Sequence, residues 1–398
     1  MAPPTFVIRY SVCLSAFQFF SVSVFPHNLL KTKEQFDLWL GTVGLGREFG
    51  GVSHVARTTL TALAAAALPV KRVISLFDTA GNAPPVPLAP GTRWSACGRN
   101  RSRFLTRVLS QAVARPDFLL FDHVDIARCQ TFLPGFLRRP YGIWVHGIEV
   151  WKQLPRRKLQ ALRQADVLLV NSRFTKNRLE EWHGPFPRAV VVPLTAEKIP
   201  EGPLPHAAAR SPSILTVGRM EPGRPKGHRE ILAALPEILR AVPGVHWHVG
   251  GTGSAFPEFR DAVRASGLQE HITLHGFVDP PALERLFREA RVFCMPSEGE
   301  GFGVVYLEAM KRGCLPVGSV MDASAEVIGD GGRCVDQSRP GELATALTAL
   351  LTMPAGESNL LQQRALSRAE MFRPETFARN LSEAIRKALS RRRIDSRR

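Results

Sequence analysis

One segment combines glycines and carboxylates in an order suited to phosphate chemistry. It runs from Pro296 to Met310 and directly follows an apolar run, Val292–Met295. Its glycines let the backbone turn sharply, and the helix expected after them offers free N–H groups that favour a phosphate. Glu300 and Glu308 lie eight residues apart, or roughly 12 Å along a helix axis. One carboxylate can therefore reach beyond the phosphates while the other accepts hydrogen bonds from a diol.

Two cations are placed to complement such a phosphate. Arg219 follows the apolar run Ser213–Val217, and Lys226 precedes a helical pattern. A guanidinium binds phosphate oxygens as a fork and an ammonium adds a point charge, which suits a departing diphosphate. Taken alone, a cation in a loop is usually just a solvent-exposed side chain. Taken alone, Glu308 could be a surface residue of a helix, and Glu300 an acid in the first helical turn that the helix dipole favours. Their combination is what indicates a site.

Short apolar runs alternate with helical patterns along the chain, which predicts parallel sheets covered by helices. In the first half the expected strands are Phe36–Val43, Arg72–Phe77, Phe118–Phe121, Gly142–Val145, Val167–Asn171 and Ala189–Val192. In the second half they are Ser213–Val217, Val245–Val249, Ile272–Leu274, Val292–Met295, Leu315–Val317 and Arg333–Val335.

This alternation predicts an α/β fold of two Rossmann-like, doubly wound domains that face each other across a cleft. Ligands of open α/β sheets bind outside the carboxyl ends of the strands, so chemistry is expected in that cleft. A proline- and alanine-rich stretch, Ala196–Pro212, resembles a linker. The expected parts are an extension over 1–35, a first domain over 36–198, a linker over 199–212, a second domain over 213–372, and a C-terminal helix with a basic tail over 373–398.

The motifs, taken in order, resemble those of the retaining glycosyltransferases of family 4, which have the GT-B fold. The resemblance covers about Leu38 to Leu389 and is most specific between Ser213 and Gly332. There it rests on Gly218-Arg219-Met220, Lys226-Gly227-His228, Gly250-Gly251-Thr252-Gly253, His275-Gly276-Phe277-Val278 and the spacing of Glu300 and Glu308. In the first half, Val145-His146-Gly147-Ile148-Glu149 is similar to the family's His-Gly motif, and Gly50-Gly51 to its glycine loop.

The resemblance implies transfer of a hexosyl group from a nucleotide-diphosphate sugar to a glycan or lipid-linked acceptor, in envelope polysaccharide or glycolipid synthesis. GDP-mannose and UDP-glucose are nearly tied as expected donors. It implies that Glu308 holds the ribose hydroxyls, that Phe277 and Val278 line the nucleobase pocket, and that Glu300 lies beside the transferred sugar. The implied catalytic residues are Glu300, His146, Arg219 and Lys226. The implied donor-binding residues are Gly51, Gly218, Arg219, Arg224, Lys226, Gly251, Phe277, Val278, Glu300, Gly301, Phe302, Gly303, Val304 and Glu308.

The chain departs from the family pattern at two points. Five residues, Glu221 to Pro225, lengthen the spacing between Arg219 and Lys226, so Arg224 is a further candidate phosphate ligand. About 35 residues also precede the first expected strand and match nothing in the family.

We assign no covalent nucleophile, because the family is thought to work without a settled one. Arg219, Lys226 and the N–H groups of residues 301–304 are expected to stabilise the diphosphate, while His146 orients the sugar. A phosphate oxygen is expected to accept the acceptor's proton. No Asp-x-Asp triplet occurs in the sequence, which predicts a metal-independent reaction with no cofactor.

The formal charge of +17 is concentrated in two segments. Cys97–Ala165 has 13 basic and four acidic residues, and Arg386–Arg398 has seven basic residues and one acidic residue. Within the first, Arg101–Arg115 combines three arginines, Arg101, Arg103 and Arg107, with the apolar residues Phe104, Val108, Leu109, Ala112 and Val113. This is the pattern of a helix on anionic lipid. The alternative is an ordinary solvated helix. We therefore expect a cytoplasmic protein that can lie peripherally at the inner face of the plasma membrane.

Other features are less informative. The six cysteines include no C-x-x-C pair, so neither a zinc site nor a disulfide framework is indicated. Phe6–Phe25 is apolar, but it contains Arg9 and lacks a basic segment before it, so it is a poor anchor or signal peptide.

Two other functions compete with the transferase. Gly44-Leu45-Gly46 followed by Gly50, with Asp78 as the acidic partner, is a weak dinucleotide fingerprint and would indicate an NAD-dependent oxidoreductase. The basic segments would suit a nucleic-acid-binding protein, although no recognition module accompanies them, so we expect no nucleic-acid partner.

Overall fold

The computed structural model describes residues 36–46, 50–79, 81, 83–196, 202–223 and 226–395. The expectations for the extension over 1–35, for Arg224 and for the last residues of the basic tail lie outside these ranges.

The first half of the described chain forms a seven-stranded sheet in which every pairing is parallel. Its strands are β1 (Leu38–Thr42), β2 (Val70–Ser75), β3 (Arg93–Ala96), β4 (Phe118–Phe121), β5 (Tyr141–Val145), β6 (Val167–Val170) and β7 (Ala189–Val191). Its helices are α1 (Gly51–Ala65), α2 (Arg101–Leu109), α3 (Gln111–Ala114), α4 (Val124–Ala127), α5 (Arg156–Gln164) and α6 (Arg173–His183), with short turns η2 (Arg128–Phe132) and η3 (Gly135–Leu137).

The second half forms a six-stranded parallel sheet. Its strands are β8 (Ser213–Val217), β9 (His246–Gly250), β10 (Ile272–Gly276), β11 (Val292–Cys294), β12 (Leu315–Ser319) and β13 (Arg333–Val335). Its helices are α7 (His228–Ala241), α8 (Phe256–Ala265), α9 (Pro280–Glu289), α10 (Val304–Lys311), α11 (Ser324–Ile328), α12 (Glu342–Thr352), α13 (Ala355–Glu370) and α14 (Pro374–Asp395), with turns η4 (Ala207–Ala209), η5 (Gln269–His271) and η6 (Gly329–Gly331).

The strand order reverses once in each sheet. The orders are β3-β2-β1-β4-β5-β6-β7 and β10-β9-β8-β11-β12-β13, so the reversals fall between β1 and β4 and between β8 and β11. A crevice opens at such a point because the loops after the two strands diverge, and ligands bind there. The topology therefore selects the loops after β1, β4, β8 and β11 as the places to seek a site.

The predicted fold class is confirmed, and each predicted strand is present to within two residues at either end. The structure also contains one strand that was not predicted, β3. Its sequence, RWSA, is not an apolar run, because β3 is an edge strand that pairs only with β2 and stays partly exposed. Continuous apolar runs mark strands that are buried on both faces, so an edge strand gives a weaker signal.

The expected linker is anchored to the second sheet's domain where it is described. Arg210 is buried and its guanidinium donates to the carbonyl oxygens of Phe287 and Ala290 at 3.1 and 2.7 Å. Ala207 is also buried. The domain boundaries themselves stay a prediction.

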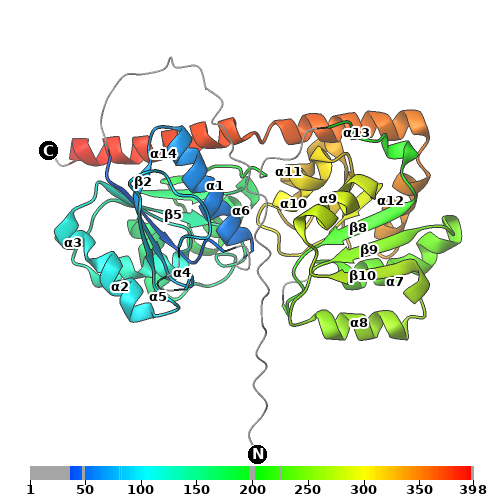
Figure 1. The fold of residues 1–398 in the computed structure, drawn as a ribbon, viewed down its shortest axis with the longest axis horizontal. Helices are drawn as coiled ribbons and strands as arrows, with labels where there is room; N and C mark the ends of the chain where they lie inside the picture. The colour runs from blue at the N-terminus through cyan, green and yellow to red at the C-terminus, as the bar shows by residue number, and fades with distance from the viewer. Residues whose placement is uncertain are drawn as a thin grey trace, which may run out of the picture. The chain divides into compact units, whose positions relative to one another are not determined.

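The C-terminal helix α14 returns to the first half of the chain. It lies beside α1 (Figure 1). It also contacts β6. The ring of Phe377 on α14 stacks on Trp144 of β5, with centroids 6.0 Å apart, and both side chains are fully buried. The last helix in the sequence thus completes the core beneath the first sheet.

We expect Phe377→Ala to destabilise the fold by about 3–5 kcal/mol, because it empties a buried aromatic site. Urea denaturation measures this. Arg379→Ala, at an exposed position on the same helix, is the matched control and should stay within about 0.5 kcal/mol of the parent. Equal effects of the two variants would contradict the packing role of Phe377.

Candidate functional site

Three predicted motifs of the second half meet at the ends of adjacent strands. The loops after β8, β9 and β10 are joined by backbone hydrogen bonds, from Gly218 N to Gly250 O at 3.0 Å and from Gly251 N to Gly276 O at 2.7 Å. Gly251 has a φ of +133°, and a Cβ there would lie 1.9 Å from the carbonyl oxygen of Gly218. Only glycine allows these loops to approach so closely.

Lys226 and Glu300 are brought together although 74 residues separate them. The Lys226 Nζ lies 2.6 Å from Glu300 Oε2, and each side chain is about one-fifth exposed. Gly227, with a φ of +81°, lets this loop pass Pro296, since a Cβ would lie 2.4 Å from the Pro296 ring. The pair therefore stands at the switch point between β8 and β11.

The backbone of Glu300 is held by a carboxylate that the sequence analysis missed. Asp322, which follows β12, accepts from Glu300 N at 3.0 Å and from Ser324 N at 2.8 Å. Burial raises the pKa of Asp322 to about 6. Gly303 then starts α10 with a φ of +91°, which orients the first amides of that helix.

Loops of the first half contact this turn at Gly301. A Cβ on Gly301 would lie 1.6 Å from the carbonyl oxygen of His146. The hydroxyls of Ser172 and Thr175, at the start of α6, donate to the Gly301 carbonyl oxygen at 2.7 and 3.2 Å. Asn171 also donates to His146 O at 2.7 Å. Both halves of the chain thus build the turn that carries Glu300.

His146 is positioned by groups at the ends of β4 and β5. Its Nε2 donates to the carbonyl oxygen of Asp122 at 2.5 Å, and its backbone N–H donates to Glu149 Oε1 at 2.5 Å. Burial lowers the pKa of His146, although the charge of Glu149 acts in the opposite direction. A neutral imidazole whose Nε2 carries the proton has an acceptor lone pair on Nδ1.

Asp122 connects the ends of β1 and β4. Its carboxylate accepts from Thr42 Oγ1 at 2.5 Å and from Val43 N at 2.9 Å. Complete burial, with a smaller contribution from the charge of nearby Asp78, raises the pKa of Asp122 to about 7. Asp122 therefore holds the end of β1 with its side chain and His146 with its main chain.

The dinucleotide fingerprint has a structural role instead. Asp78 accepts hydrogen bonds from Leu45 N at 2.8 Å and Gly46 N at 3.3 Å. These amides are the ones a pyrophosphate would need, and Asp78 is the residue that the oxidoreductase alternative assigned to a ribose. The loop after β1 is thus closed by its own carboxylate.

Other predicted site residues are less tightly gathered. Arg219 is exposed at the end of β8, Phe277 is 81% exposed after β10, and Gly51 is exposed at the start of α1. Val278 is half-buried against the core, and Glu308 lies half-buried on α10. Their binding roles stay predictions.

The aromatic ring of Phe302 is not at the surface of the site. It is 2% exposed and packs edge-to-face on Phe372, with centroids 5.6 Å apart. The Phe302 side chain therefore belongs to the core, and only the Phe302 backbone remains a candidate for contact with the sugar donor.

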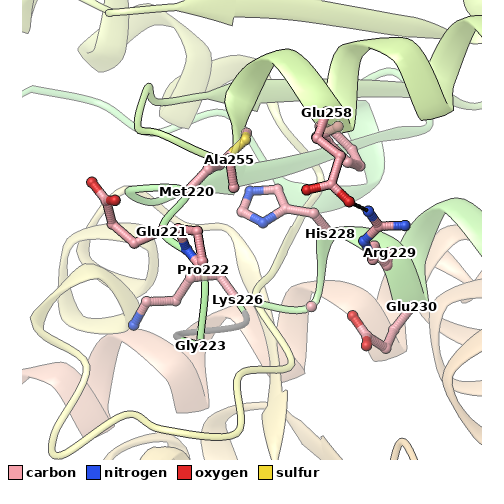
Figure 2. A pocket seen from close by; sticks show the side chains of 12 residues that line it. Met220, Glu221, Pro222, Gly223, Lys226, His228, Arg229, Glu230, Ala255 and Glu258 are labelled. Atoms are coloured by element: carbon pink, nitrogen blue, oxygen red, sulfur yellow. Dashed lines mark hydrogen bonds and ion pairs between the residues drawn. The ribbon is translucent and has the colours of Figure 1, made fainter.

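A pocket of about 330 Å³ borders the loop between β8 and α7, which carries Lys226 (Figure 2). Its lining includes Lys226 but none of residues 299–304. His228 lies among the lining side chains, and burial together with the charge of Lys226 lowers its pKa to about 4. The Arg229–Glu258 ion pair, 2.6 Å long, closes one wall.

Within the described ranges, no group of three or more histidine, cysteine, aspartate or glutamate side chains is arranged to hold a metal ion. Among the helices that the structure describes, none is both long and apolar enough to cross a bilayer.

Comparison with known proteins identifies the family of a segment in the second half of the chain. Residues 211–353 match the family described as Glycosyl transferases group 1. This segment is a glycosyl transferases group 1 domain. It contains Arg219, Lys226, Gly251, Glu300 and Glu308, so the resemblance drawn from the motifs is confirmed.

The curated relatives of this glycosyl transferases group 1 domain include mannosyltransferases. Over 142 residues the chain is 37% identical to a phosphatidyl-myo-inositol mannosyltransferase of Mycobacterium leprae, covering 35% of this chain and 37% of that protein. Over 232 residues it is 30% identical to a GDP-mannose-dependent alpha-(1-6)-phosphatidylinositol monomannoside mannosyltransferase of Mycolicibacterium smegmatis, covering 52% and 60%. The chain thus spans between about a third and three-fifths of these relatives' lengths.

Solved structures agree over a larger part of the chain. Sucrose-phosphate synthase from Thermosynechococcus elongatus superposes with a TM-score of 0.73 at 19% identity, covering 89% of this chain and 99% of that one. Anabaena HepE, solved with UDP and glucose, superposes with a TM-score of 0.67 at 15% identity, covering 88% and 100%. The glycosyl transferases group 1 domain is therefore one half of a GT-B fold, as predicted.

We expect Gly301→Ala to destabilise the protein by about 1–3 kcal/mol, because the added methyl group would overlap the His146 carbonyl oxygen. Urea denaturation measures the loss. Gly299→Ala is the matched control, since a Cβ there would lie 3.1 Å from the Cγ2 methyl group of Ile148, a side-chain atom, and would not overlap backbone. If the control costs as much, the close contact at Gly301 does not carry the effect.

Asp122 should impose a pH dependence on stability. Its pKa is raised from an ordinary 3.8 to about 7, so between those values the native state keeps a proton that the unfolded state releases. Stability from this group therefore falls as pH rises through the window, by at most about 1.4 kcal/mol per unit. Asp122→Asn should lose relatively less stability than the parent between pH 5 and 7 in urea denaturation. A constant difference between variant and parent would refute this.

Proposed function

We propose that this chain is a retaining glycosyltransferase that moves a hexosyl group from a nucleotide-diphosphate sugar to a glycan or lipid-linked acceptor. The observation that carries the proposal is the Lys226–Glu300 pair at the turn before α10. A cation, a carboxylate and the first amides of a helix stand there at a topological switch point. These are the groups that stabilise a departing diphosphate and hold a sugar beside it.

The donor diphosphate would bind at Lys226, Arg219 and the amides of residues 301–304. Binding requires the Lys226 ammonium to exchange some of its contact with Glu300 for phosphate oxygens. Glu300 then becomes available to accept hydrogen bonds from the sugar hydroxyls. Glu308, farther along α10, would accept from the ribose, and the exposed ring of Phe277 offers a face for the base.

His146 would orient the transferred sugar. With Nε2 donating to Asp122 O, its Nδ1 presents a lone pair that accepts a hydrogen bond from a sugar hydroxyl. Its lowered pKa keeps the ring neutral near pH 7. A positioned neutral acceptor fixes geometry and leaves the acceptor's proton for a phosphate oxygen.

Retention follows if the acceptor hydroxyl enters on the face that the diphosphate leaves. We propose that no protein nucleophile and no metal ion take part. The anomeric configuration of the product by NMR tests retention, and undiminished activity in excess EDTA tests the absence of a metal ion.

GDP-mannose is the preferred donor, with UDP-glucose second. A relative that is 30% identical is named as GDP-mannose-dependent. A screen of nucleotide sugars by donor hydrolysis decides the matter. Release of GDP from GDP-mannose supports the proposal, whereas failure with every nucleotide sugar, or NAD binding instead, refutes it.

Glu308→Ala should weaken nucleotide binding by roughly 10- to 100-fold, because a charged acceptor to the ribose hydroxyls is worth about 1.5–3 kcal/mol. Calorimetry with GDP and with UDP measures the change. Glu289→Ala, at an exposed position on α9, should leave both affinities unaltered. Unchanged affinity in the Glu308 variant would remove the ribose assignment.

We also propose that the protein reaches lipid-linked acceptors at the cytoplasmic face of an anionic membrane. The segment expected to lie on lipid is only partly suited to it, because Phe104 and Val108 of α2 are buried in the core while Val113 of α3 is 88% exposed. Larger exposed apolar side chains occur on η2 and η3, where Phe136 is 87% and Phe132 is 50% exposed. Arg157 lies 4.5 Å from the Phe132 ring centroid. Aromatic side chains beside arginines suit a headgroup region.

Phe136→Ser should reduce flotation with vesicles of 30% phosphatidylglycerol several-fold. Trp182→Ser removes another exposed aromatic ring, on α6, and should float like the parent. Binding of the parent should also decline at high salt, because the arginine contribution is screened. Equal flotation of the two variants would exclude this surface.

A further inference from the structure

A second pocket, of about 340 Å³, lies where both halves of the chain meet α13 and α14. Three arginines line it. Arg173 comes from the start of α6, Arg368 from the end of α13, and Arg373 from the turn before α14. One carboxylate, Glu326 of α11, shares the lining.

The carboxylate of Glu326 is already engaged by the backbone. It accepts from Arg173 N at 3.0 Å and from Phe174 N at 3.1 Å, which places it on the N-terminus of α6. A carboxylate there satisfies the helix amides and their partial positive charge. Both carboxylate oxygens of Glu326 therefore accept from backbone amides, and in the part of the chain that the structure describes Glu326 makes no ion pair with the three arginines.

The guanidinium groups have little anionic compensation. Arg368 donates to the carbonyl oxygens of Glu326 and Val327, at 2.5 and 3.1 Å. Arg373 pairs with Glu370 at 2.7 Å, but both side chains are more than half exposed, and such pairs contribute little. Within the described ranges, the side chain of Arg173 makes no ion pair. The pocket is thus a concave site with net positive charge.

Apolar side chains cover part of the same pocket. Met371 is 61% exposed, and Phe372, half-buried, lies under the guanidinium of Arg368 with 5.2 Å to its ring centroid. A bare inorganic anion would leave this surface unused. A ligand with a phosphate and a carbon skeleton would use both parts.

We propose that this pocket binds the phosphate group of a small phosphorylated organic molecule the size of a hexose monophosphate. The phosphate lies among Arg173, Arg368 and Arg373, and the carbon skeleton lies on Met371 and Phe372. The site shares no residue with the proposed donor site, so it stands whether or not the chain transfers sugars.

The test is calorimetry on the full chain with saturating GDP, which blocks the proposed nucleotide site. The probes are mannose 6-phosphate, inorganic phosphate and mannose. We expect mannose 6-phosphate to bind at least about tenfold more tightly than inorganic phosphate, and mannose not to bind. Equal affinity for the two phosphates would overturn the organic part of the proposal, and binding of mannose alone would overturn the phosphate part.

Variants locate the ligand. Arg173→Gln and Arg373→Gln should each weaken binding by about tenfold, the effect of losing one charge-assisted contact. Arg364→Gln, exposed on α13 and outside the lining, should bind like the parent. Unaltered binding in both pocket variants would overturn the assignment.

One variant should act in the opposite direction. Glu370→Gln removes the carboxylate that pairs with Arg373 and should tighten mannose 6-phosphate binding by up to about fivefold. A gain of affinity cannot arise from partial unfolding. Weaker or unchanged binding in this variant would count against the participation of Arg373.

Discussion

The carbonyl oxygen of Gly301 accepts hydrogen bonds from the hydroxyls of Ser172 and Thr175, while the Gly301 Cα lies against the His146–Gly147 backbone. This contact fits together only because no side chain is present at position 301. It fixes the turn before α10 relative to loops of the other sheet. The Lys226–Glu300 pair and the amides of α10 depend on that turn, and the carbonyl oxygen of His146 lies against it.

Buried carboxylates stabilise the remaining loops at the strand ends. Asp78 holds the loop after β1, Asp122 holds the end of β1 itself, and Asp322 holds the backbone of Glu300. The burial of Asp122 and Asp322 is costly, as their raised pKa values indicate. The cost is offset by hydrogen bonds to backbone amides that would otherwise be unpaired. The result is a set of loops held in place before any ligand arrives.

Much of the fold could be predicted because strands buried on both faces are continuous apolar runs. The edge strand β3 could not, since an edge is partly exposed and its residues need not be apolar. The partner of the apolar face of α2 could not be predicted for a related reason. An amphipathic pattern says that one face is apolar, but not whether that face meets lipid or, as Phe104 and Val108 do, the protein core.

The sequence by itself determined the parallel α/β architecture and the glycine, cation and carboxylate motifs of the second half, because periodicity and local spacing encode both. Only the tertiary structure decided which side chains support them. Ser172 is 129 residues from Gly301 in the sequence. Asp322 follows Glu300 by 22 residues, which include the helix α10 and the strand β12. Such partners carry no mark in the sequence, because the first contact depends on how the two sheets pack together and the second on the pairing of β11 with β12.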